Sequence, residues 1–119
     1  MKIKSILVSV LLVFATVNWV IAQGWPGDPK NGRAIYEKHC IRCHGVAGKG
    51  DGVDGASLVV SPANFQSQRS REKPDFELLI TISHGIAYSP MHGWRGRLSE
   101  DEMWDVISYI RTMAPFKPI

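Results

Sequence analysis

The sequence predicts an all-α domain with three main helices. Apolar residues recur at helical spacing in three segments, 29–39, 75–83 and 100–113, and each segment has a recognisable start or stop signal. No stretch alternates polar and apolar residues for long enough to indicate a β-strand, and no internal repeat is present. With 119 residues, the chain is of the length expected for one domain.

The first 22 residues have the layout of a secretory signal peptide. A basic start, Met1-Lys2-Ile3-Lys4, is followed by the mainly apolar run from Ile6 to Ile21, and small or tolerated residues precede Gln23. The apolar run is shorter than the roughly 20 residues that a membrane-spanning helix needs, which favours cleavage over an uncleaved N-terminal anchor. We therefore expect an exported, periplasmic protein whose folded domain comprises residues 23–119.

The charge of that domain is nearly balanced. Without Lys2 and Lys4, the 14 basic side chains of the whole chain fall to 12, against 11 acidic ones. This balance gives no indication of nucleic-acid binding. A domain of this size has a limited core and often depends on a disulfide, a metal or a cofactor for stability.

The first helix is predicted from Pro29 to His39. Asp28 has the character of an N-cap, and proline is favoured at the first helical position. Gly32, Ile35, Tyr36 and His39 recur at helical spacing on one face.

The next five residues, Cys40-Ile41-Arg42-Cys43-His44, have the form C-x-x-C-H, which is the attachment sequence of a c-type haem. On a helical turn the two cysteines face the same way, so that each thiol can add to one vinyl group of a single haem. His44 follows at once and can bind the iron from the same side. The sequence therefore predicts one covalent haem c, held by Cys40 and Cys43.

Two other interpretations of the paired cysteines are less favoured. A redox disulfide of the thioredoxin type requires a βαβ pattern around the motif, and none is visible. A structural zinc site requires about four nitrogen or sulfur ligands, whereas the chain has two cysteines and four scattered histidines.

Segment 45–64 is predicted to be a loop. It contains five glycines between residues 45 and 55, and several of these positions are expected to have positive φ. The pattern G-x-x-x-x-G-K-[ST] of a phosphate-binding loop is absent. We expect the backbone to wrap closely over the haem edge, with apolar residues 58–60 covering a face. Polar segment 66–73 is expected to be exposed.

The second helix is predicted to begin at Pro74 or Asp75 and to end near Ser83, because Gly85 resembles a helix stop. Its expected buried face comprises Phe76, Leu79, Ile80 and Ser83.

The last helix is predicted from Glu100 to Met113, before Pro115. Residues 99–102 read Ser-Glu-Asp-Glu, which fits the S-x-x-E capping box. The expected apolar face comprises Met103, Val106, Ile107, Ile110 and Met113, with Tyr109 alongside.

Met91 is the preferred second iron ligand, opposite His44. It lies in the irregular segment between the second and last helices, beside Pro90, where helix packing does not need it. Met103 and Met113 lie instead at helical spacing among apolar residues, which indicates core filling.

Three further histidines lie near the predicted ligands in the sequence. His92 and His84 remain alternatives to the methionine, although His84 is also placed to cap the end of a helix. His39 is expected on the helix surface. Ligation by histidine and methionine raises the reduction potential and leaves no open iron position, which favours electron transfer over catalysis.

These features together resemble the class I c-type cytochromes, in particular small bacterial monohaem cytochromes c. The resemblance covers residues 28–113 and rests on the C-x-x-C-H motif after the first helix and on a methionine before the last one. Segments 48–52 and 62–65 resemble the loop that follows the haem motif in this family. The resemblance implies the cytochrome c fold, with helices and loops wrapped around the haem.

The family resemblance also implies particular contacts. First and last helices of the family cross at a glycine and aromatic contact, for which Gly32 and Tyr36 match the first helix and Val106 and Tyr109 the last. A carbonyl of a proline-containing loop accepts a hydrogen bond from the haem-ligand imidazole, and Pro62 is the candidate here.

The methionine loop departs from the family pattern. Proline usually follows the ligand methionine, whereas here Pro90 precedes it and His92 follows it. This departure keeps His92 as an alternative ligand or a pH-sensitive neighbour of the haem.

The expected function is the transfer of single electrons between periplasmic redox proteins, without enzymatic activity of its own. One alternative is a haem-bearing subunit of a larger respiratory or dehydrogenase complex. We expect association with a membrane only through such a complex or through an uncleaved N-terminal anchor. Another is a five-coordinate haem protein that binds ligands or has peroxidase activity. Basic residues that surround the predicted site could steer an acidic partner: Lys30, Arg33, Lys38, Arg42, Lys49, Arg95 and Arg97.

Overall fold

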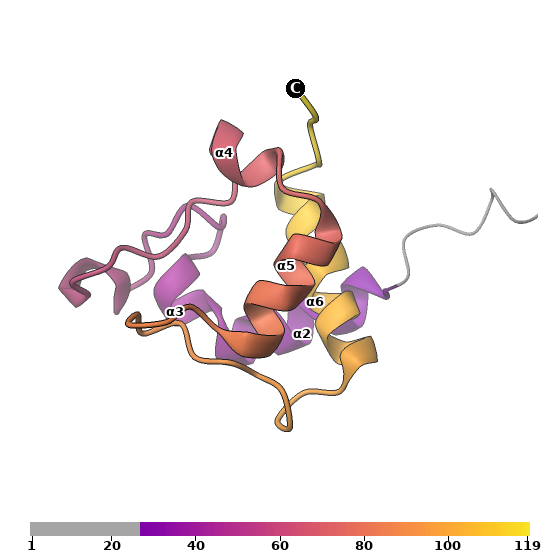
Figure 1. Cartoon of the computed structure of the whole chain (residues 1–119), viewed down its shortest axis with the longest axis horizontal. Coiled ribbons are helices and arrows are strands. Elements are labelled where there is room, and N and C mark those ends of the chain that lie inside the picture. The colour runs from indigo at the N-terminus through magenta and orange to yellow at the C-terminus, as the bar shows by residue number, and fades with distance from the viewer. Residues whose placement is uncertain (1–26) are drawn as a thin grey trace, which may run out of the picture.

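The structure, a computed structural model, describes residues 27–119 as helices joined by long loops (Figure 1). The elements are α2 (Pro29–His39), α3 (Ile41–His44), the 3-10 turn η1 (Gly55–Ser57), α4 (Gln68–Arg71), α5 (Asp75–His84) and α6 (Glu100–Met113). In this part of the chain the only β-type pairings are two isolated bridges. The all-α prediction is therefore confirmed.

The predicted signal peptide, residues 1–22, lies outside the described residues. Of the helices that the structure describes, none has the length and apolar character needed to cross a membrane.

The core is built on the crossing of α2 and α6 (Figure 1). A Cβ atom added to Gly32 would lie 1.9 Å from the backbone oxygen of Asp105, so only glycine permits this approach. Close by, the rings of Tyr36 and Tyr109 pack edge to face, with centroids 5.3 Å apart. The predicted crosswise contact of the first and last helices is confirmed.

The start of α2 is fixed both by its own cap and by α6. The side chain of Asp28 accepts a hydrogen bond from the backbone N–H of Lys30 at 2.9 Å, as its predicted N-cap role requires. The carboxylate of Asp105 in α6 accepts from the Asp28 backbone N–H and from Asn31 Nδ2, both at 2.6 Å. The sequence pattern gave no sign of this second contact.

The predicted buried face of α5 is confirmed at Leu79 but wrong at two positions. Phe76 is 64% exposed and Ile80 is 46% exposed. Besides Leu79, the buried positions are Asp75, Leu78 and Ile82. The helix is turned in this way because Asp75 pairs with Arg111 of α6, and the residues one turn further along then face α6 as well.

The termini of the remaining elements follow local rules. At α6, the Ser99 side chain accepts from the Glu102 N–H while the Glu102 carboxylate accepts from the Ser99 N–H, so the capping box is confirmed. The C-cap of α5 is Gly85, with φ of 75°. The polar segment 66–73, which was expected to be exposed, contains the short helix α4. The sequence pattern did not predict this helix, and the Ser67 side chain caps it.

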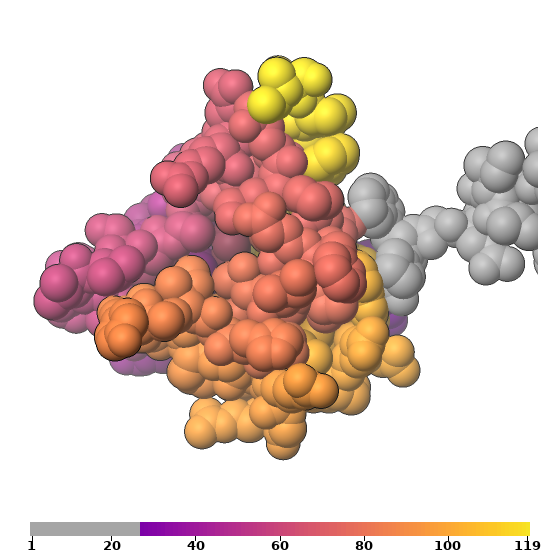
Figure 2. All heavy atoms as spheres, viewed as in Figure 1, coloured from indigo at the N-terminus to yellow at the C-terminus, as the bar shows by residue number. Residues whose placement is uncertain are grey.

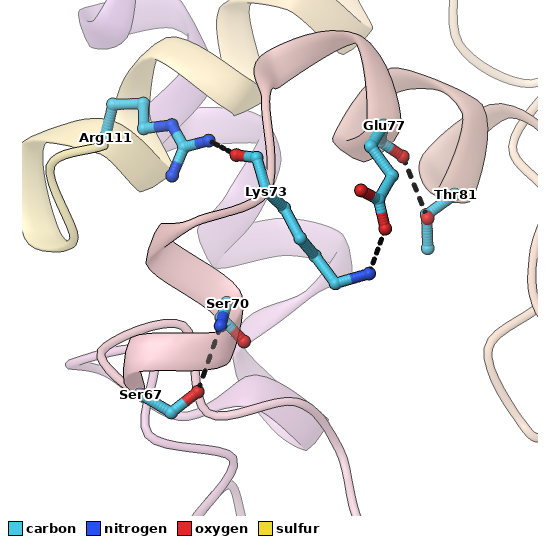
Figure 3. A network of polar contacts seen from close by, with 6 residues as sticks. All are labelled: Ser67, Ser70, Lys73, Glu77, Thr81 and Arg111. Carbon is cyan, nitrogen blue, oxygen red and sulfur yellow. Dashed lines mark hydrogen bonds and ion pairs between the residues drawn. The ribbon is translucent and has the colours of Figure 1, made fainter. Parts of the chain in front are cut away.

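Asp75 and Arg111 form a buried ion pair between α5 and α6. Arg111 Nε donates to Asp75 Oδ1 at 2.6 Å, and Arg111 Nη2 donates to the carbonyl of Lys73 at 2.5 Å. Figure 3 shows the second of these bonds, which ties the start of α5 to α6. The other carboxylate oxygen, Asp75 Oδ2, is buried without a hydrogen-bond partner among the described residues. Loss of either partner would leave a buried charge unpaired and is therefore expected to destabilise the domain strongly.

Candidate haem site

A cavity of ≈ 220 Å³ lies between the helices and two loops, and it contains the sequence-predicted site. Its lining includes all five predicted residues: Cys40, Cys43, His44, Pro62 and Met91. The loops that carry Pro62 and Met91 flank one side of the molecule, drawn in pink and orange in Figure 2. The structure thus brings together residues that are up to 51 positions apart in the chain.

The C-x-x-C-H motif is positioned by the end of α2 and by α3. Cys40 is the C-cap of α2, and its carbonyl accepts from the backbone N–H of His44 at 2.9 Å. Both cysteines and the histidine therefore lie on one tight helical turn that faces the cavity. Burial, and to a smaller extent the nearby Cys43, raises the pKa of the Cys40 thiol to about 12, which keeps this thiol protonated.

The end of the motif is held by a buried tyrosine. Tyr36 is 1% exposed, and its hydroxyl donates to the carbonyl of Gly45 at 2.8 Å. Gly45 has φ of 81°, which lets the chain turn directly after His44. Tyr36 thus links the helix crossing to the haem motif.

Replacing Tyr36 with phenylalanine is expected to reduce the free energy of unfolding by about 1–2 kcal/mol, because the Gly45 carbonyl loses a buried donor. Burial raises the pKa of Tyr36 above the ordinary value of 10.0. The neutral phenol therefore contributes stability that is fully present below about pH 10 and is lost as the pH rises further.

Urea unfolding at neutral and at alkaline pH tests both effects, and the variant should lack this part of the alkaline loss. The matched control is Tyr88→Phe, because Tyr88 is fully exposed. Equal alkaline loss in the Tyr36 variant and the native protein would contradict the expectation.

His44 is oriented by the loop that follows it. Its Nδ1 lies 3.3 Å from the carbonyl of Ala63, and a carbonyl can only accept, so Nδ1 carries the hydrogen in this contact. The Phe65 ring stacks on the imidazole with centroids 4.6 Å apart. Burial lowers the pKa of His44 and outweighs the opposite effect of the Ala63 hydrogen bond. The neutral imidazole keeps Nε2 available as a metal ligand.

The carbonyl predicted to accept from the imidazole was that of Pro62, and the structure gives this contact to Ala63 instead. The Pro62 carbonyl lies over Gly50, where an added Cβ atom would be only 2.5 Å from that oxygen. The accepting carbonyl thus belongs to the proline-containing loop, but to the residue after Pro62.

Met91 lies in a short turn between α5 and α6. Its backbone carbonyl accepts from the N–H of Ile86 at 2.8 Å, and its own N–H donates to Ser89 Oγ at 3.2 Å. Its half-buried side chain lines the cavity. The irregular segment expected here is confirmed, and its hydrogen bonds hold Met91 at the cavity wall.

The alternative ligand His84 is directed to its own helix. Its Nδ1 lies 3.2 Å from the carbonyl of Ile80, which is the capping contact expected at the end of α5. It is exposed and is not among the residues that line the cavity.

His92 also lines the cavity and remains an alternative ligand. Its ring packs against Trp94 with centroids 4.7 Å apart, and Trp94 packs against His39 at 4.9 Å. Trp94 was not singled out from the sequence, because a lone aromatic residue in a loop carries no periodic signal. It connects the methionine loop to the end of α2.

The zinc interpretation finds no support in residues 27–119, where no three His, Cys, Asp or Glu side chains gather around a common point. The cavity lining is mainly apolar, as a large organic ring requires.

The family model described as cytochrome c matches residues 29–114 of this chain. The chain belongs to the cytochrome c family. Members of this family carry covalently bound haem c with its iron, and the cavity fits this group because it unites the attachment motif with an apolar lining. The comparison thereby supports the assignment of the cavity as the haem site.

Two relatives are longer proteins. The thiosulfate dehydrogenase of Allochromatium vinosum is 26% identical over 85 residues, which make up 71% of this chain and 31% of that protein. A chain of the reducing HAO-like protein complex of Kuenenia stuttgartiensis superposes with a TM-score of 0.64 at 29% identity, covering 75% of this chain and 44% of that chain. This chain thus spans less than half the length of either relative.

The KustC0563 c-type cytochrome is closer in size. It superposes with a TM-score of 0.59 at 23% identity, covering 70% of this chain and 96% of that chain. This likeness confirms the fold.

Proposed function

We propose that this cytochrome transfers single electrons between redox proteins in the periplasm, with one haem attached to Cys40 and Cys43 and with His44 and Met91 as iron ligands. The observation that supports this proposal is that all four residues line one mainly apolar cavity. When bound, the haem supplies an iron that can accept and release one electron.

The residues of the chain have separate tasks in this proposal. The two cysteines hold the haem through thioethers, and the His44 ring is oriented by Ala63 and Phe65. The turn that contains Met91 presents a soft thioether sulfur, which favours the reduced state of an iron. An apolar lining excludes water and also disfavours the more highly charged oxidised state.

Optical spectra of the holoprotein, oxidised and then reduced, test the proposed ligands. We expect sharp low-spin bands and the weak far-red ferric band of a methionine–iron bond. Met91→Ala should lose that band, and its reduced form should bind carbon monoxide, because one iron position becomes open.

The matched control is Met113→Ala, which removes a half-buried methionine of α6 that does not line the cavity. It should keep both the far-red band and the resistance to carbon monoxide. Retention of the band in Met91→Ala would contradict the proposal. A low-spin wild-type protein without the band, together with carbon monoxide binding by reduced His92→Asn, would assign the ligand to His92. A high-spin wild-type protein that binds carbon monoxide would favour the five-coordinate alternative, with ligand binding or peroxidase activity.

A second candidate function is that of a haem-bearing subunit in a larger oxidoreductase. The names of two relatives favour this function, because one is a thiosulfate dehydrogenase and the other is a chain of an HAO-like protein complex. Gel filtration of the native extract distinguishes a free carrier from a subunit.

The charge on the surface bears on how a partner is recognised. Two of the basic residues near the site are paired within the domain, Arg33 with Glu37 at 2.8 Å and Arg42 with Asp54 at 2.7 Å. We therefore propose that the domain attracts an acidic partner less strongly than the number of its basic residues suggests.

A further inference from the structure

The charged side chains of the cavity lining are distributed unevenly. Among the described residues that line it, Lys73 is the only lysine or arginine, and none is aspartate or glutamate. A haem carries two propionate carboxylates, and a partly buried carboxylate needs a cation or hydrogen-bond donors. Lys73 is therefore the side chain of the lining that is best suited to this charge.

The backbone of Lys73 is held in place by a buried arginine. Arg111 Nη2 donates to the Lys73 carbonyl at 2.5 Å, and Arg111 is itself fixed by Asp75. Figure 3 shows the Lys73 side chain extending from the segment between α4 and α5 toward Glu77. The backbone from which the lysine side chain extends is thus fixed relative to α6.

The ammonium group of Lys73 already has a carboxylate partner. Lys73 Nζ pairs with the carboxylate of Glu77, one turn into α5, and the Lys73 side chain is 36% exposed. Ser70 and Thr81, both drawn in Figure 3, line the cavity together with Lys73. The Thr81 hydroxyl donates to the Glu77 carbonyl, so Ser70 is the better placed hydroxyl for a ligand.

We propose that Lys73, assisted by Ser70, binds one haem propionate, in competition with Glu77. This inference rests on the proposed attachment of the haem at Cys40 and Cys43. An ammonium group beside the propionate offsets its negative charge, so loss of the ammonium favours the ferric state. Lys73 thereby sets part of the reduction potential.

The test compares Lys73→Gln with Lys49→Gln in the holoprotein. Each variant removes one positive charge. Lys73 lines the cavity, whereas Lys49 is exposed and does not, so only Lys73→Gln removes a charge from the site. At a fixed electrode potential we expect the ratio of ferrous to ferric protein to fall a few-fold in Lys73→Gln and to change little in Lys49→Gln. Glu77→Gln should raise the ratio, because the lysine is then released to the propionate.

Carbon-13 NMR of the propionate carboxyl groups provides an independent readout. One of the two resonances should shift in Lys73→Gln, and neither should shift in Lys49→Gln. Equal effects of the two lysine variants on both measurements would overturn the proposal. An altered salt dependence of the reaction with a redox partner, with unchanged potential and propionate resonances, would overturn it too and assign Lys73 to docking.

The two proposals fail in distinguishable ways. A wild-type protein without the optical spectrum of a covalent haem contradicts the proposed function and this inference together. Normal wild-type spectra with an unresponsive potential in Lys73→Gln contradict this inference alone.

Discussion

Replacing Arg111 with methionine is expected to lower the free energy of unfolding by about 3–5 kcal/mol, because it leaves the buried Asp75 carboxylate without its cation. Asp75 Oδ2 has no hydrogen-bond partner among the described residues, so no contact of that oxygen compensates for the loss of Arg111. Methionine retains much of the volume of arginine, which limits the effect of a cavity. Urea unfolding of the holoprotein measures the loss.

Two controls separate charge burial from other effects. Arg33→Met disrupts an exposed pair with Glu37 and should cost at most about 1 kcal/mol. In the double variant Asp75→Leu/Arg111→Met, no buried charge is left unpaired, so most of the stability should return. If the double variant were as unstable as Arg111→Met, packing and not the buried charge would explain the loss.

Replacing Gly32 with alanine is expected to destabilise the domain by about 1–3 kcal/mol or more, although alanine favours helices by about 1 kcal/mol over glycine. The added methyl group would lie 1.9 Å from the Asp105 carbonyl oxygen, which belongs to the backbone and cannot rotate away. The two helices must therefore separate, and the edge-to-face contact of Tyr36 with Tyr109 is lost with them. Thermal unfolding of the holoprotein monitors the effect.

The reverse substitution at an exposed position of the same helix is the control. Ala34→Gly should cost only about 1 kcal/mol, which is the difference in helix propensity. Greater stability of Gly32→Ala than of the native protein would show that the helix crossing tolerates a side chain, contrary to this account.

Features governed by neighbouring residues were predictable from the sequence. The N-cap at Asp28 and the capping box at Ser99 were both found where predicted, because each involves hydrogen bonds within one helical turn. The haem motif was equally clear, since its three functional residues lie within five positions. Gly32 was recognised through the family resemblance.

Features that depend on distant residues were not predictable in the same way. Asp75 and Arg111 are 36 positions apart, and each alone looks like an ordinary charged residue of a helix. Because this pair turns α5, apolar periodicity alone assigned Phe76 and Ile80 to the wrong face. The carbonyl that accepts from His44, that of Ala63 and not of Pro62, likewise lies 19 positions further along the chain.

The contact of Asp105 with the start of α2 has a consequence for orientation. Gly27 packs against the backbone of α6, where an added Cβ atom would lie 2.3 Å from the Trp104 oxygen. In Figure 1 the start of α2 lies on the side of α6, opposite α3 and the loops that enclose the cavity. A redox partner that approaches the cavity would therefore meet α3 and these loops, and the crossing of α2 with α6 would stay out of the interface.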